Sequence, residues 1–140
     1  MMEGFTSTPR YLLMHNRSPI GPSVVERAGV EVTAIYAFSD KTKYDAFLHQ
    51  SSVVPTPYPL VKGFLQVQLE GDATRLHLMV VDAASPTQAD LEAATYQAII
   101  ESIDLKTTSV QVSYHLTLDE PSGLYHVHAL AGLLSPGASE

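Results

Sequence analysis

The amino-acid sequence predicts an α+β fold of two layers, in which two helices cover one face of an antiparallel sheet of about five or six strands. Several short segments alternate apolar and polar residues with the period of two that strands require, among them VEVTAIYAF at 30–38. Two other segments space their apolar residues at i, i+3 and i+4, as amphipathic helices do. The 140 residues are 45% hydrophobic and 16% charged and contain no internal repeat, which indicates one globular domain.

The predicted domain spans residues 10–134. Short polar segments at 1–9 and 135–140 are expected to form flexible tails on either side of it. The first strand of the domain is the apolar run RYLLMH at 10–15. The sequence does not fix the position of this strand in the sheet.

A strand followed by a helix comes after the loop at 16–29, which contains two prolines and two glycines. The strand is the alternating segment at 30–38, and the helix covers 39–50. Ser39 or Asp40 can cap this helix, because either side chain accepts a hydrogen bond from a free N–H group of the first turn. The apolar stripe of the helix comprises Tyr44, Phe47 and Leu48.

The segment at 60–82 is predicted to be a β-hairpin with its turn at Gly71 and Asp72. It follows VVPTPYP at 53–59, whose three prolines exclude a helix and require an extended connection. Both arms of the hairpin alternate apolar and mainly polar residues. The side chains expected to face away from the core include Gln66, Gln68 and His77.

The second helix is predicted at 85–106. Ser85 suits its N-cap, Pro86 suits its first position, and Gln88 completes a capping box. Its expected core-facing stripe comprises Ala89, Ala93, Tyr96, Ile100 and Ile103.

The order of these elements over residues 30–118 is βαββαβ, which in topology resembles the ferredoxin-like folds. Right-handed crossovers would place both helices on one face of the sheet. The last strands are predicted at 108–118 and 124–133, and the second of them extends the sheet edge beside the first. Because the resemblance concerns topology alone, it implies no function.

The last two strands can be aligned by their apolar patterns. Every residue of even number from Val110 to Leu118 is apolar. In 124–131 the apolar set consists of residues of odd number, namely Tyr125, Val127, Ala129 and Ala131. A four-residue turn from Glu120 to Gly123 places both apolar sets on one face. This register pairs Asp119 with Leu124, Thr117 with His126, and His115 with His128.

Three imidazoles are therefore expected together on the face that the helices leave open, with His77, Gln66 and Gln68 on the same face some strands away. Side chains directly opposite each other on neighbouring strands have Cβ atoms about 4.5–5.5 Å apart, so His115, His126 and His128 can converge on one Zn²⁺ ion. Their spacing matches no established metal motif. The alternatives are a solvated polar face and a pH-sensitive contact.

The composition disfavours several classes of function. The chain contains no cysteine, which excludes disulfides, thiolate catalysis and cysteine-ligated zinc. Its net charge is −7 and its eight basic residues are scattered, so neither nucleic acid nor an anionic membrane surface is an expected partner. No secretory signal or spanning segment is evident, and a cytoplasmic location is expected. No catalytic motif is present, and the dispersed carboxylates nominate no acid/base pair.

Two functional hypotheses remain. The first is a non-catalytic module that self-associates or binds a partner protein through the mixed open face or the sheet edge, because a one-sided sheet needs a cover or sufficient polarity. The alternative is a small enzyme or a ligand or metal sensor. A concave pocket that holds at least two of the histidines and a carboxylate would favour the alternative. Its expected ligand-binding residues are His77, His115, His126, His128, Gln66 and Gln68.

Overall fold

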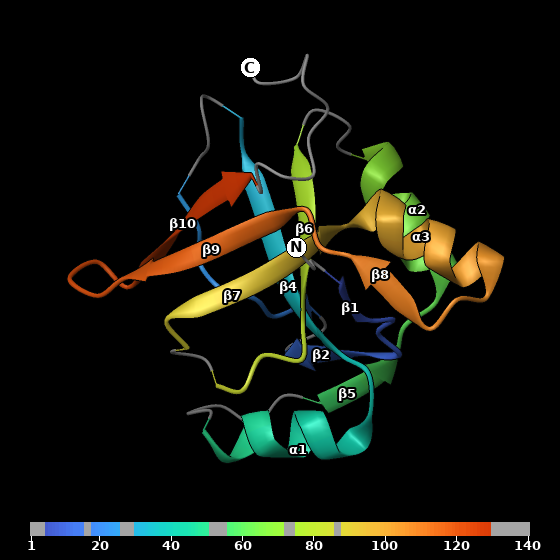
Figure 1. The fold of residues 1–140 in the computed structure, drawn as a ribbon, viewed down its shortest axis with the longest axis horizontal. Helices are drawn as coiled ribbons and strands as arrows, with labels where there is room; N and C mark the ends of the chain where they lie inside the picture. Colours follow the sequence, from blue (N-terminus) through green and yellow to red (C-terminus); the bar gives the residue numbers. More distant parts are fainter. Residues whose placement is uncertain are drawn as a thin grey trace.

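The computed structural model describes residues 5–15, 18–25, 30–50, 56–71, 75–85 and 88–129. Within these ranges the chain is an α+β fold with three helices and a mostly antiparallel sheet (Figure 1). The helices are α1 (Lys41–His49), α2 (Lys62–Gly71) and α3 (Tyr96–Leu105).

The main sheet has the strand order β10-β9-β7-β6-β4-β2-β3, and β5 also pairs with β2. A separate two-stranded ribbon joins β1 to β8. Strands β4 and β6 run parallel, whereas the other paired strands run antiparallel. The strands are β1 (Phe5–Ser7), β2 (Tyr11–His15), β3 (Ser18–Pro19), β4 (Val32–Phe38), β5 (Thr56–Pro59), β6 (Leu76–Val81), β7 (Asp90–Thr95), β8 (Ser109–Gln111), β9 (Tyr114–Asp119) and β10 (Leu124–Ala129).

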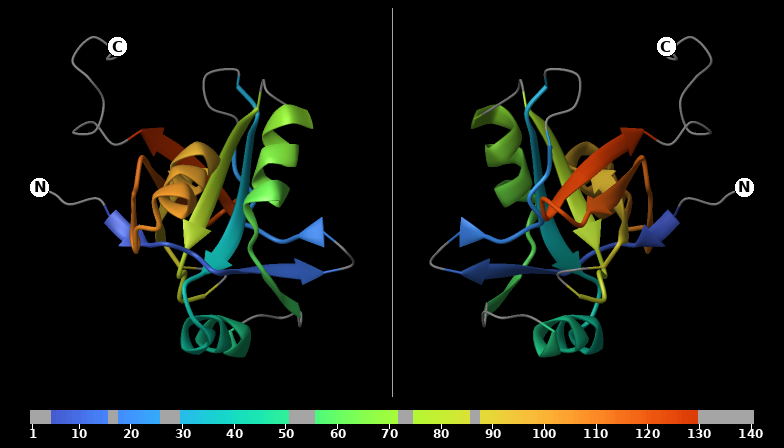
Figure 2. Two further views of the ribbon diagram at one scale, coloured as in Figure 1. Left: turned by 90° about the vertical axis from the view of Figure 1, so that its right-hand side faces the viewer. Right: turned by 90° about the vertical axis from the view of Figure 1, so that its left-hand side faces the viewer.

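Helices pack against both faces of the sheet. On β4, Tyr36 and Phe38 face one apolar cluster together with Phe47 of α1. Ile35 on the same strand faces a second cluster, which contains residues of α2 and α3. Figures 1 and 2 show α2 and α3 beside β4 and β6, and α1 across the end of these strands. The prediction that the helices lie on one face is therefore wrong, because the central strands are apolar on both faces and need cover on each.

The predicted hairpin at 60–82 is also wrong in its first arm, which forms helix α2. Leu65 is buried, and Phe64 and Leu69 pack around the same cluster, so one side of the helix faces the sheet. The segment fits both periods, and a short apolar run with both periods cannot be assigned by pattern alone. The second arm is β6, which pairs with β4 instead of with 60–70.

The helix predicted at 85–106 begins eleven residues later, at Tyr96. Strand β7 occupies 90–95, and Thr95 caps α3 by accepting a hydrogen bond from the N–H of Ala98 at 3.1 Å. Residues Leu91 and Ala93 face the first apolar cluster, so the segment alternates as a strand does. The alanines of this segment fit either structure, which is why the helical pattern was misleading.

Other parts of the prediction are confirmed. Asp40 caps α1, accepting from the N–H of Lys43, and β10 extends the edge beside β9. The strand expected at 10–15 is β2, between β4 and β5. The segment expected at 108–118 is divided into β8 and β9. The ferredoxin-like order is not confirmed, because 30–118 runs β4-α1-β5-α2-β6-β7-α3-β8-β9.

The chain ends lie partly outside the described residues. Residues 5–7, expected in a tail, form β1 and pair with β8 in the register Phe5 to Gln111 and Ser7 to Ser109. The expected tail at 135–140 and the end of the predicted last strand, 130–133, are outside the described ranges.

Candidate functional site

The predicted register of the last hairpin is confirmed. Leu124 pairs with Asp119, His126 with Thr117, and His128 with His115. Tyr125 and Val127 are buried, whereas the side chains of His126 and His128 are exposed. The three imidazoles therefore share one face, on the side of β9 and β10 away from the buried residues.

Strand β7 adds two carboxylates to this face. Glu92 pairs with His115, and Asp90 pairs with Thr117. Two rows of three side chains thus cross β7, β9 and β10. We call these six residues the polar grid: Glu92, His115 and His128 in one row, and Asp90, Thr117 and His126 in the other.

The polar grid lies on the same sheet face as α2 and α3, which cover this face at β4 and β6. Glu92 and Ala94 point to the same side of β7, and Ala94 belongs to the apolar cluster that contains α3 residues. The expectation that the histidines occupy the face opposite to the helices is therefore wrong, although His126 and His128 are exposed and His115 is partly exposed. Both carboxylates were absent from the predicted site because residues 85–106 were predicted to form a helix, whereas Asp90 and Glu92 lie in β7. The alternation Asp-Leu-Glu-Ala at 90–93 was the signal that could have placed them.

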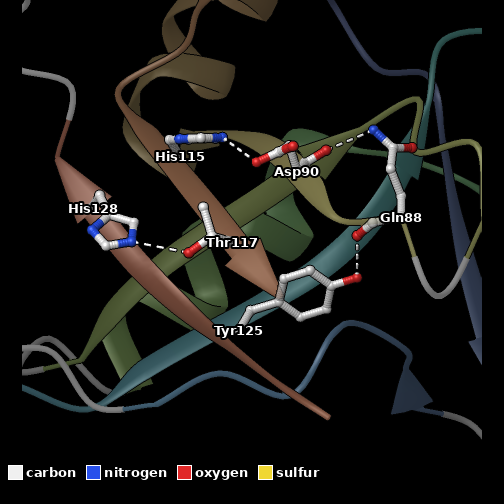
Figure 3. Close-up of polar contacts among 6 residues, drawn as sticks. All are labelled: Gln88, Asp90, His115, Thr117, Tyr125 and His128. Carbon is white, nitrogen blue, oxygen red and sulfur yellow. Dashed lines mark hydrogen bonds and ion pairs between the residues drawn. The ribbon is translucent and has the colours of Figure 1, made fainter. Parts of the chain in front are cut away.

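Two polar contacts order the grid (Figure 3). The Nε2 atom of His115 lies 3.2 Å from Oδ1 of Asp90. The Nε2 atom of His128 lies 3.1 Å from Oγ1 of Thr117. The ring centroids of His115 and His128 are 6.4 Å apart. His115 is thus held by a carboxylate on one side and neighboured by a second imidazole on the other.

A pocket of about 610 Å³ opens beside the grid and includes His115, Asp90 and Glu92. It lies at the carboxyl end of β6, and β6 runs parallel to β4. The β1–β8 ribbon contributes another wall. The remaining lining residues are Phe5, Thr6, Ser7, Lys43, Val80, Val81, Asp82, Ala83, Gln88, Leu91 and Ser109.

Carboxylates outnumber cationic groups in this pocket. The carboxylate of Asp82 is already occupied, since it accepts from the N–H and the hydroxyl of Ser39, each at 2.8 Å. Asp90 engages His115. Glu92 has no partner among the described residues, and neither has the ammonium of Lys43. With three carboxylates to one lysine, the pocket favours a positively charged ligand.

The other predicted site residues lie apart from the pocket. His77 does share the sheet face of the grid, but it is buried, with its ring centroid 5.1 Å from that of Tyr96 in α3. Gln66 and Gln68 are exposed on α2. Of the four histidines named from the sequence, only His115 lines the pocket.

Within the part of the chain that is described, no three His, Asp or Glu side chains gather closely enough to hold a metal ion. Zinc binding by His115, His126 and His128 stays a prediction, which a zinc titration would test. Comparison of the chain with protein-family models, curated proteins and solved structures finds no match.

Proposed function

We propose that this chain is a small-ligand-binding domain that holds an organic cation in the pocket and exchanges a proton with it through His115. The observation that carries the proposal is an imidazole whose Nε2 lies 3.2 Å from a carboxylate oxygen, at the wall of a pocket of about 610 Å³. Pockets of this size with a few convergent polar groups are the usual sites for small molecules.

The lining favours an amine or a guanidine. The carboxylate of Glu92 has no partner among the described residues, so it can accept charge-assisted hydrogen bonds from an ammonium group. Phe5 lines the same pocket and is 62% exposed, so it is accessible to a ligand. An aromatic face attracts a cation and also packs against the apolar body of the ligand.

The His115–Asp90 pair supports proton transfer. When His115 is neutral, an Asp90 carboxylate next to Nε2 favours the tautomer that carries its proton there. Nδ1 is then the acceptor for a proton from the ligand. A carboxylate next to an imidazole also holds the orientation of the ring, as in other acid–base pairs.

Calorimetry with n-butylamine tests the proposal, with n-butanol and butyrate as neutral and anionic probes of similar size. We expect saturable binding of the amine alone. Glu92→Gln should weaken it about tenfold, because one charge-assisted hydrogen bond is lost. The matched control is Glu70→Gln, which removes an exposed carboxylate of α2 outside the pocket. Equal affinity of Glu92→Gln and wild type, or no amine binding up to about 100 mM, contradicts the proposal.

A second candidate is self-association or partner binding, the first hypothesis from the sequence. Exposed apolar side chains support it: Tyr58 and Val61 precede α2, and Leu105 ends α3. The ion pair between Lys62 and Asp104, at 2.6 Å, joins these two places. The supporting surface is thus beside α2 and α3 and not on the polar grid, and exposed apolar patches mark interfaces when they are contiguous.

Sedimentation equilibrium tests this candidate. A homo-oligomer should show a mass above 15.2 kDa that falls toward the monomer in the double variant Val61→Ser, Leu105→Ser. A monomer at all concentrations, together with no captured partner, removes it. None of the described helices is long and apolar enough to cross a membrane. A cytoplasmic location and the lack of nucleic-acid partners remain proposals from charge and composition.

A further inference from the structure

The side chain and the main-chain carbonyl of Gln88 together make three hydrogen bonds at the wall of the pocket. Its Nε2 donates to the carbonyl of Asp90 at 2.7 Å, and its Oε1 accepts from the N–H of Ala84 at 2.7 Å. Its own carbonyl accepts from the hydroxyl of Tyr125 at 2.6 Å. Figure 3 shows Gln88 between Asp90 and Tyr125, with His115 on the far side of Asp90.

The side-chain contacts require an amide. Oε1 meets a donor and Nε2 meets an acceptor, so neither a carboxylate nor an apolar group of the same length satisfies both. The two contacts join Ala84, in the loop after β6, to Asp90, the first residue of β7. Gln88 thus fixes the main chain from which the Asp90 side chain projects.

The third contact ties this loop to the hairpin that carries His126 and His128. Tyr125 of β10 is buried, and burial raises the pKa of its phenol, which keeps the hydroxyl protonated as a donor. The backbone of Tyr125 is held as well, since its N–H donates to Ser23 and its carbonyl accepts from Val25. The main chain of Tyr125 is therefore held by two hydrogen bonds, while its hydroxyl donates to Gln88.

Asp90 needs such support because its contact with His115 is exposed. The Asp90 side chain is 69% exposed and that of His115 is 35% exposed. An ion pair at the surface contributes about 0–1 kcal/mol, too little to hold one rotamer by itself. The contact with His115 therefore also depends on where the main chain places the Cα–Cβ bond of Asp90.

We propose that Gln88 is a positioning residue, which holds the main chain of Asp90 so that its carboxylate reaches Nε2 of His115. The role of this carboxylate toward a ligand rests on the function proposed above. The positioning itself does not, because it concerns the order of Asp90 in the free protein.

Three-bond NMR couplings that report the χ1 angle of Asp90 test the inference in the ligand-free protein. We expect one rotamer in the wild type and averaged values in Gln88→Leu and Gln88→Glu. The second variant keeps an acceptor for Ala84 but lacks the donor to Asp90. Gln68→Leu, an exposed glutamine of α2, is the control and should leave Asp90 unchanged. The contact between Asp90 and the His115 ring, seen as a nuclear Overhauser effect, should weaken in the same two variants.

Wild-type couplings in either folded Gln88 variant overturn the inference. If both variants fail to fold, the wild type decides, because an averaged Asp90 rotamer there also overturns it. In another outcome, the amine fails to bind while the Gln88 variants still show averaged couplings for Asp90. This result would remove the proposed ligand and leave the positioning role of Gln88 in place. The two outcomes are therefore distinguishable.

Discussion

Asp82 is held in a left-handed backbone conformation, with φ of 61°, that residues other than glycine adopt infrequently. Its N–H donates to the carbonyl of Ala37 at 2.8 Å, and its carboxylate accepts both donors of Ser39. These contacts join the carboxyl ends of β4 and β6 at the pocket. Strained residues often occur at functional sites, where surrounding contacts hold them.

We predict that Asp82→Ala lowers the free energy of unfolding by about 2–3 kcal/mol, because two hydrogen bonds to a charged group are lost while the strain stays. Asp82→Asn keeps an acceptor for the N–H of Ser39 and should cost less. Urea denaturation measures both values. A loss below about 0.5 kcal/mol for Asp82→Ala would show that the hydrogen bonds between Asp82 and Ser39 are not important for stability.

Gly21 lies against the backbone of β4. A Cβ atom there would be 1.9 Å from the carbonyl oxygen of Ala34 and 2.6 Å from Cα of Ile35, so the main chain would have to move. We predict that Gly21→Ala destabilises the protein by more than about 2 kcal/mol, a typical cost of overpacking. Gly63→Ala is the control, because nothing lies within 4 Å of its added carbon and alanine favours a helix. Similar melting temperatures of the two variants would contradict the packing described here.

At the scale of elements, the last hairpin could be predicted residue by residue and the middle of the chain could not. In 114–129 one face is buried and the turn length is fixed, so only one register satisfies the apolar pattern. In 62–71 and 90–95 the apolar residues fit strand and helix alike, and contacts distant in sequence decide. The histidines of the grid were therefore predicted, whereas its carboxylates and the pocket were not.

Helix α2 gives a direct test of the element that the sequence misassigned. In a strand, Leu65 and Val67 would share one face, but in α2 Leu65 is fully buried and Val67 is 63% exposed. We predict that Leu65→Ala costs about 2–5 kcal/mol, while Val67→Lys costs less than about 0.5 kcal/mol. Chemical denaturation measures both. A comparable large loss for Val67→Lys would favour the strand.

At the scale of the whole molecule, buried tyrosines make the fold sensitive to alkaline pH. Burial raises the pKa of Tyr96 from 10.0 to about 12, and burial also raises the pKa of Tyr36 and Tyr125. The folded protein therefore retains protons that the unfolded chain releases near pH 10. The contribution of these protonated phenols to the free energy of unfolding is fully present below about pH 10. It is lost as the pH rises toward about 12.

For Tyr96 alone this loss is on the order of 2 kcal/mol, since each pKa unit corresponds to about 1.4 kcal/mol. We predict that Tyr96→Phe reduces the slope of unfolding free energy against pH between about 10 and 12. Denaturant titrations at a series of pH values measure it. Tyr58→Phe, at an exposed position, is the control and should keep the wild-type slope. Equal slopes in all three proteins would mean that Tyr96 is not protected from ionisation by the fold.

The central claim, that a cationic ligand occupies the pocket next to the His115–Asp90 pair, is tested most directly by NMR of the histidine rings during an n-butylamine titration at constant pH. His115 lines the pocket, whereas His126 lies on the same face outside it, so the two rings form an internal comparison. We predict a saturable shift of the His115 ring resonances with little change at His126. Chemical-shift changes that are equal for the His115 and His126 rings and do not saturate would contradict the proposed binding site.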